Sequence, residues 1–154
     1  MMDRYKNRAF TLVEVLVAVT MTALVTVIAI PYLANSLAHY QTVTTVRKLV
    51  ADIQYTQQLA VTTEDTTAAY EMVFRRDQEK YYIKHGTQIL RTERFPTWVD
   101  LAGTNVQAGG ESNILAFTVQ GSPVGAGTIT IKNRRTGKSY SVKVAVMTGR
   151  VRVE

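Results

Sequence analysis

Apolar residues follow one another almost without interruption from Ala9 to Pro31, and Glu14 is the one charged residue in this stretch. The 21 residues from Phe10 to Ile30 would form a helix of about 30 Å, which matches the hydrocarbon thickness of a bilayer. A carboxylate in a membrane helix is disfavoured by a few kcal/mol unless it is paired. The pattern therefore predicts a membrane-spanning helix in which Glu14 needs a partner.

Beyond Pro31 the helical spacing continues, but only one side of the helix stays apolar. This pattern predicts a helix that reaches about Thr62 and packs one face against a folded domain. Pro31 is the only proline in the helix, and we expect a kink or a local melting there. Poor helix formers at 62–67 should end it. The apolar stripe consists of Val43, Val46, Leu49, Val50, Ile53 and Ala60.

From about Ala68 onward the pattern changes to short strands in which apolar and polar residues alternate. Asn133–Lys138 should be a hairpin loop, and Gly109-Gly110 and Gly121-Ser122-Pro123 should be turns. Because no helix separates the strands, we expect an antiparallel sandwich or curled sheet, and an α+β fold class for the whole chain. The expected strands are Ala69–Arg75, Lys80–His85, Gln88–Thr92, Ile114–Val119, Thr128–Lys132, Ser139–Val146 and Arg150–Val153.

Three interpretations of the N-terminal apolar run are open. A cleaved secretory signal has a shorter apolar stretch followed by a small-residue cleavage site, whereas this run continues as helix. A simple membrane anchor fits the length but gives no role to Glu14. A cut between Ala9 and Phe10 would create a free α-amino group on Phe10, and that cation could pair with Glu14 of a neighbouring copy in an assembly.

The segment K-N-R-A-F-T-L-V-E-V resembles the class III leader and cleavage site of type IV pilins and type II secretion pseudopilins. The resemblance implies that prepilin peptidase cuts between Ala9 and Phe10 and methylates the new N-terminus. It also implies that Glu14, the fifth mature residue, and Pro31, the twenty-second, act in assembly with other pilin or pseudopilin subunits. The family usually has Gly before the cut, so Ala9 is a departure.

The second half of the chain resembles the globular domain of H-type pseudopilins and FimT-like minor pilins. Phe117 and Gly121 in F-x-x-x-G, the strand G-T-I-T-I and the closing Gly149-Arg150 carry the resemblance. It implies a pilin-like fold with a long N-terminal helix packed on a β-rich domain. The expected divisions are a leader at 1–9, a transmembrane and assembly half of the helix at 10–33, an amphipathic half at 34–66 and a β-rich globular domain at 67–154.

Composition and charge indicate on which side of the membrane the globular domain lies and which functions are not expected. The chain has no cysteine, so disulfides contribute nothing. Basic residues in the leader favour a cytoplasmic N-terminus in the inner membrane, with the globular domain on the outer side. His39 and His85 are isolated, and no catalytic or nucleotide-binding motif is present, so we expect neither an enzyme nor a metal site or cofactor.

Positive charge gathers near the end of the chain, where residues 112–154 contain seven Lys or Arg and one Glu. One interpretation is a solvated face of the last hairpins. The other is a nonspecific contact surface for DNA phosphates, which the G-R-x-R ending shares with FimT-like minor pilins. The candidate residues are Arg150 and Arg152, helped by Arg134, Arg135 and Lys138.

Two functional classes therefore remain. The first is a structural minor pilin or pseudopilin of a type IV pilus or type II secretion pseudopilus. The second is a DNA-binding minor pilin that serves DNA uptake in natural competence. An unrelated signal-anchored β domain would leave the spacing of Glu14 and Pro31 to coincidence.

Overall fold

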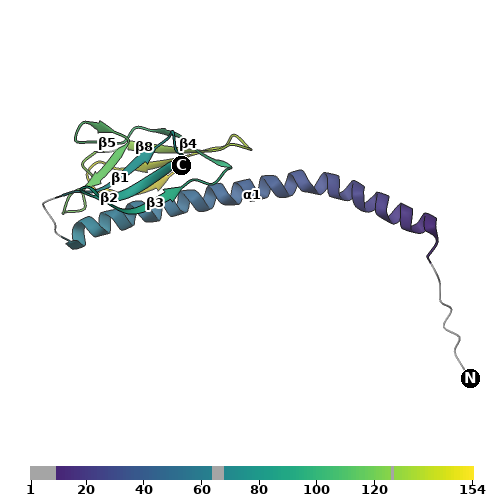
Figure 1. The fold of residues 1–154 in the computed structure, drawn as a ribbon. Helices are drawn as coiled ribbons and strands as arrows, with labels where there is room; N and C mark the ends of the chain where they lie inside the picture. The colour runs from purple at the N-terminus through teal and green to yellow at the C-terminus, as the bar shows by residue number, and fades with distance from the viewer. Residues whose placement is uncertain (1–9, 64–67, 126) are drawn as a thin grey trace, which may run out of the picture. The chain divides into compact units, whose positions relative to one another are not determined.

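The computed structural model describes residues 10–63, 68–125 and 127–154 (Figure 1). It divides into two compact units, Met1–Ser36 and Leu37–Glu154. Helix α1 (Leu12–Thr63) supplies most of the described part of the first unit and the first element of the second. The predicted leader at 1–9 and most of the expected helix-ending segment, residues 64–67, lie outside the described residues.

α1 remains helical on both sides of Pro31, although proline lacks the N–H that the helix would use there. The expectation of a local melting at Pro31 is therefore wrong, because the helix continues through this position. Three threonine hydroxyls in the apolar run each donate to a carbonyl of the preceding turn, which satisfies them within the helix. These side chains belong to Thr20, Thr22 and Thr26.

The strands described in the second unit pair antiparallel in three sheets. The first sheet has the order β3-β2-β1-β7 and contains β3 (Gln88–Arg94), β2 (Lys80–His85), β1 (Tyr70–Arg75) and β7 (Ile114–Phe117). The second has the order β10-β9-β8-β4 and contains β10 (Val151–Val153), β9 (Ser139–Val144), β8 (Gly127–Asn133) and β4 (Val99–Thr104). A short hairpin joins β5 (Gln107–Ala108) to β6 (Glu111–Ser112).

Each strand expected from the alternating pattern is present, with ends that differ by at most two residues. The expected turn at Gly109-Gly110 connects β5 to β6. The pattern missed β4, whose sequence V-D-L-A-G-T contains Asp100 and Gly103, two residues of low strand propensity. It also missed β5 and β6, which at two residues each are too short to show a period.

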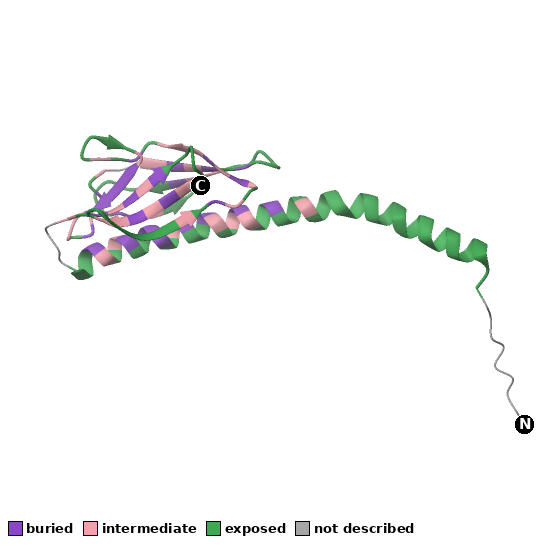
Figure 2. Ribbon diagram, viewed as in Figure 1, coloured by how far each residue is buried: buried purple, intermediate pink, exposed green. Residues whose placement is uncertain are grey.

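One core joins the second half of α1 to both large sheets. The helix contributes Val46, Leu49, Ile53 and Ala60, while Val43 and Val50 are half-buried. Figure 2 shows this buried stripe running along the helix below the strands. The predicted stripe is confirmed, but the structure adds three buried polar residues on the same face, Thr42, Asp52 and Thr56.

Candidate assembly and anion-binding sites

Glu14 lies in the first turn of α1 and forms a capping box with Thr11. The Glu14 N–H donates to Thr11 Oγ1 at 3.2 Å, and the Thr11 N–H donates to Glu14 Oε2 at 3.4 Å. Two backbone donors at the helix start thereby gain acceptors. The T-x-x-E spacing signals this local role, which the sequence interpretation missed. The box supplies no opposite charge, and no ion pair joins Glu14 to another described residue.

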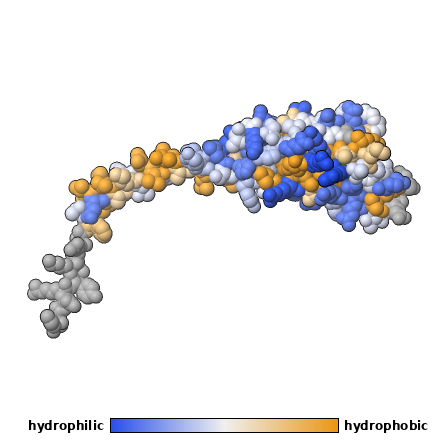
Figure 3. Space-filling model, turned by 180° about the vertical axis from the view of Figure 1, so that it is seen from behind, coloured by the Kyte–Doolittle hydropathy of each residue, from blue (hydrophilic) through white to orange (hydrophobic). Residues whose placement is uncertain are grey.

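The apolar part of α1 offers its side chains to the surroundings on every side. Each residue from Phe10 to Leu33 is exposed, Pro31 included. Figure 3 shows mostly apolar side chains along this segment. Among the described residues, α1 is the one helix long and apolar enough to cross a membrane, judged by length and composition. Phe10 precedes the helix and is exposed, while Ala9 lies outside the described residues.

The five cations considered for DNA contact fall into two groups. Arg134, Arg135 and Lys138 occupy the loop between β8 and β9. Arg150 lies beyond the other end of β9, where its carbonyl accepts the Ala145 N–H at 3.0 Å. Because β9 lies between the two groups, they are separated by roughly 20 Å of extended chain. The structure therefore does not bring the loop cations together with Arg150 and Arg152.

The outer basic cluster, as we call Lys143, Arg150 and Arg152, lines one shallow hollow with Thr148. Arg152 pairs directly with Lys143 across β9 and β10, so the two side chains share a face. The neighbouring Val142 and Val144 are buried, which directs Lys143 away from the core. Lys143 Nζ lies 2.6 Å from Glu154 Oε2, and this ion pair lowers the positive charge of the cluster. Sequence reasoning missed Lys143, which the hairpin register reveals.

The basic hairpin, as we call the loop residues Arg134, Arg135 and Lys138, has different contacts from the outer basic cluster. Arg134 Nη2 lies 2.7 Å from Glu79 Oε1 and 3.5 Å from Asp100 Oδ1, so two carboxylates neutralise it. The other two cations lie over aromatic rings. The Arg135 guanidinium is 5.5 Å from the centre of the Trp98 ring, and Lys138 Nζ is 5.3 Å from the centre of the Tyr140 ring.

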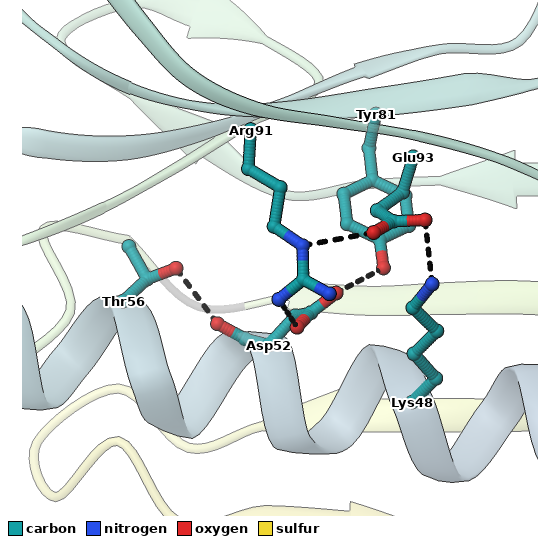
Figure 4. Close-up of polar contacts among 6 residues, drawn as sticks. All are labelled: Lys48, Asp52, Thr56, Tyr81, Arg91 and Glu93. Carbon is teal, nitrogen blue, oxygen red and sulfur yellow. Dashed lines mark hydrogen bonds and ion pairs between the residues drawn. The ribbon is translucent and has the colours of Figure 1, made fainter.

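A buried carboxylate connects α1 to β2 and β3 (Figure 4). Asp52 accepts a hydrogen bond from the Tyr81 hydroxyl at 2.5 Å and one from Arg91 Nη1 at 3.0 Å. Glu93 then bridges Arg91 Nε at 2.8 Å and Lys48 Nζ at 2.6 Å. Burial, with the hydrogen bond to Asp52, raises the pKa of Tyr81 far above its usual range. The hydrogen bond from Lys48 is the main cause that lowers the pKa of Glu93.

The glycines that carried the family resemblance lie against α1. Gly121 and Gly149 both have positive φ angles, +77° and +63°. Gln57 Nε2 donates to the Gly121 carbonyl at 2.7 Å, and a Cβ on Gly149 would lie only 2.5 Å from the same nitrogen. The F-x-x-x-G and G-R motifs therefore contain positions where an added Cβ would have to displace a side chain of the helix.

The two histidines have structural contacts. His39 Nδ1 lies 3.4 Å from the Tyr140 hydroxyl, and the His85 ring stacks on Tyr70 with centroids 4.3 Å apart. His85 Nε2 also lies 3.2 Å from the Ala68 carbonyl. Within the described ranges 10–63, 68–125 and 127–154, no group of three or more His, Cys, Asp or Glu could hold a metal ion.

A known sequence motif and a known structure resemble this chain. The prokaryotic N-terminal methylation motif matches residues 4–30, which include Phe10 and Glu14. The crystal structure of the type IV minor pilin FimU from Pseudomonas aeruginosa strain PAO1 matches with a TM-score of 0.57. The match covers 75% of this chain and 90% of that chain, at 17% sequence identity. The chain has a pilin fold. No curated protein matches it in sequence.

The pilin fold confirms the α+β class and the long N-terminal helix expected from the sequence. Motif and fold together support the pilin superfamily. A structural match at 17% sequence identity shows a shared fold and nothing finer. The H-type and FimT-like resemblance therefore stays a prediction.

Proposed function

We propose that this chain is a minor pilin or pseudopilin, a structural subunit of a type IV pilus or a type II secretion pseudopilus rather than an enzyme. The observation that carries the proposal is a methylation motif on an exposed apolar helix that continues into a pilin fold. In the proposed topology, residues 10–33 anchor the chain in the cytoplasmic membrane. The globular domain lies on the outer side until the chain joins other subunits in a filament.

The proposed processing gives Glu14 an ionic partner, which no other described residue provides. Prepilin peptidase would cut between Ala9 and Phe10 and methylate the new α-amino group. The amino group remains a cation, and a neighbouring subunit can bring it to Glu14. In a low-dielectric helical bundle, an unpaired carboxylate is strongly disfavoured while a paired one is tolerated. The ion pair would therefore favour the incorporated subunit over an unpaired one.

Two substitutions separate the ion pair from the capping box. Glu14→Gln keeps an acceptor at the capping position but removes the charge, so we expect normal membrane insertion and impaired incorporation into filaments. Thr11→Ala removes the cap, which costs helices about 0.5–2 kcal/mol, but keeps the charge. We expect it to incorporate. Intact mass of the membrane-extracted protein should show a chain that starts at N-methylated Phe10 in both variants.

Filament shearing followed by immunoblotting provides the measurement. Normal incorporation of Glu14→Gln would contradict the ion-pair role. Retention of Met1 in cells with an active prepilin peptidase would contradict the processing.

A DNA-binding role in natural competence is the second candidate function. The observation that favours it is the outer basic cluster, in which Lys143, Arg150 and Arg152 share one outward face. Phosphate contacts release counterions, so the affinity should be insensitive to sequence and should fall with salt, with a log–log slope of about −0.9 per contact on duplex DNA. Two to three contacts give a slope of roughly −2 to −3.

A salt series of gel shifts tests this second function. Arg150→Gln combined with Arg152→Gln should flatten the slope by up to about 2 units. The matched control is Arg135→Gln combined with Lys138→Gln, which removes the same charge at the far end of β9 and should leave the slope nearly unchanged. If duplex DNA does not bind at low salt, the structural role stands alone.

A further inference from the structure

The basic hairpin is fixed to the place where α1 enters the second unit. Asn133, at the end of β8, is buried, and its Nδ2 donates to the Ala38 carbonyl at 3.0 Å and to Thr42 Oγ1 at 2.8 Å. Asn133 Oδ1 accepts the Arg135 and Thr136 N–H groups at 2.9 Å each, which shapes the loop. A single buried side chain thus holds the hairpin against the first turns of α1 in this unit.

Connectivity then limits how far the hairpin can lie from a membrane, on the proposed function that α1 is inserted. If about 20 residues from Leu12 cross the hydrocarbon core, the helix leaves it near Tyr32. Ala38 follows Tyr32 by only six residues, a length of about 9 Å as helix. The polar headgroup layer on each side is about 5–8 Å thick. This short connection therefore keeps the hairpin within reach of the headgroups.

The side chains of the hairpin and those beside it have the chemistry of a membrane interface. Arg135 lies over Trp98, and Lys138 lies over Tyr140. Tyr40 on α1 is largely exposed. Aromatic rings with one polar edge collect at headgroup level, and Lys and Arg extend to lipid phosphates. The nearby carboxylates of Glu79 and Asp100 are both engaged by Arg134, so they neutralise the third cation of the hairpin.

We propose that the basic hairpin binds the anionic phospholipid headgroups of the leaflet from which α1 emerges. Arg135 and Lys138 contact the phosphates, while Trp98 and Tyr140 lie at the boundary between headgroups and water. Each cation near an anionic surface shifts the contact equilibrium by about fivefold. The contact holds the domain against the bilayer before assembly, and extraction of the subunit into a filament releases it.

Trp98 is the only tryptophan of the chain, so its fluorescence reports on this surface alone. The full chain is reconstituted in nanodiscs of phosphatidylcholine, or of phosphatidylcholine mixed with phosphatidylglycerol, with and without a headgroup spin label. The proposal expects stronger quenching of Trp98 by the label in the anionic discs. High salt should remove the difference, because the Debye length falls from about 10 Å at 0.1 M to about 3 Å at 1 M.

Matched charge variants make the test specific. Arg135→Gln with Lys138→Gln should reduce quenching in anionic discs to the level of neutral discs. Arg150→Gln with Arg152→Gln removes the same charge about one strand length away and should leave quenching unchanged. Quenching is expressed as the ratio with and without label, because loss of Arg135 can alter the Trp98 emission itself. The salt series on the unaltered chain needs no variant to fold.

The possible outcomes separate the headgroup contact from the proposed membrane insertion. Equal quenching in neutral and anionic discs, or an equal loss in both variant pairs, overturns the headgroup contact. If the chain enters the discs but Trp98 is not quenched, only this inference fails. If the chain does not enter the discs at all, the proposed membrane insertion fails and the inference fails with it.

Discussion

At the scale of single residues, polar side chains fix the position of α1 on the sheets. Asp52 is almost fully buried, and a carboxylate in that position is tolerated only with hydrogen-bond partners. Tyr81 supplies one donor and, with its raised pKa, stays protonated throughout the physiological range. Arg91 supplies the second donor from β3. Apolar contacts alone would allow the helix to slide by a turn, whereas these directional bonds favour one register.

The ion pair between Lys48 and Glu93 gives this contact a pH dependence. The pKa of Glu93 is lowered in the folded chain, so its contribution to stability is present above the ordinary Glu pKa of about 4.3. That contribution is lost as the pH falls through the lower, folded-state pKa. Lys48→Met removes the main cause of the shift. We expect it to lower the free energy of unfolding by about 0.2–1 kcal/mol at pH 7, and by less at acid pH.

Urea denaturation at pH 7 and near pH 3 measures this difference. Arg47→Met is the control, since it removes a cation from the adjacent exposed position of α1. A loss of stability from Lys48→Met that is the same at both pH values would contradict the role of Glu93.

At the scale of elements, close contacts between loops and helix explain why two motif glycines occur where they do. Gly121 precedes Pro123, which bridges to Phe117 at the end of β7, and Gly149 precedes β10. Both lie beside Gln57 of α1, and the Gln57 amide bonds the carbonyl of one of them. The two loops thereby hold one helical position from different parts of the chain.

Gly149→Ala should therefore destabilise the second unit by about 2–3 kcal/mol. Roughly 1–2 kcal/mol comes from a positive φ in a residue with a Cβ, and about 1 kcal/mol from displacement of Gln57 away from the Gly121 carbonyl. Gly137→Ala is the matched control, because its φ is +73° but no atom lies within 4 Å of the added Cβ. Gly137→Ala should destabilise the unit only by the roughly 1–2 kcal/mol that comes from the positive φ. Denaturation midpoints of both variants provide the measurement.

A double substitution checks the contact itself. Gln57→Ala removes the side chain that the new methyl group would meet. Adding it to Gly149→Ala should cost less than the sum of the two single changes, and strict additivity would contradict the proposed contact.

Sequence patterns predicted the elements of this fold better than the contacts between them. Alternation located seven strands, because one face of each packs in the core. Apolar periodicity could not reveal that Thr42 and Asp52 belong to the buried stripe. Their partners, Asn133 and Tyr81, are distant in sequence, and a polar residue is buried only once such partners are in place.

The candidate site shows the same limit. The positive charge of residues 112–154 was evident in the sequence, but its division into two separate groups of side chains was not. An antiparallel hairpin sends residues that are near in sequence to opposite ends of a strand. The register, known only from the structure, separates the basic hairpin from the outer basic cluster and adds Lys143 to the latter.

At the scale of the whole molecule, the second unit contains all of the hydrophobic core that the described residues form. Its first buried residue is Ala38, and every helical member of the core lies between Val46 and Ala60. A chain that begins at Leu37 should therefore be soluble, β-rich and monomeric. A chain that begins at Thr42 should also fold, but with about 1–3 kcal/mol less stability, because Asn133 loses the Ala38 carbonyl as an acceptor.

A chain that begins after the helix, at residue 68, tests whether the stripe belongs to this core. Without Val46, Leu49 and Ile53, the inner faces of both large sheets would be exposed to water as one apolar patch. Patches of that kind cause association, so we expect aggregation and no cooperative unfolding transition. Size-exclusion chromatography and urea denaturation, compared with the chain that begins at Leu37, give the answer. Equal solubility and stability of the two chains would assign the stripe to contacts with other subunits instead.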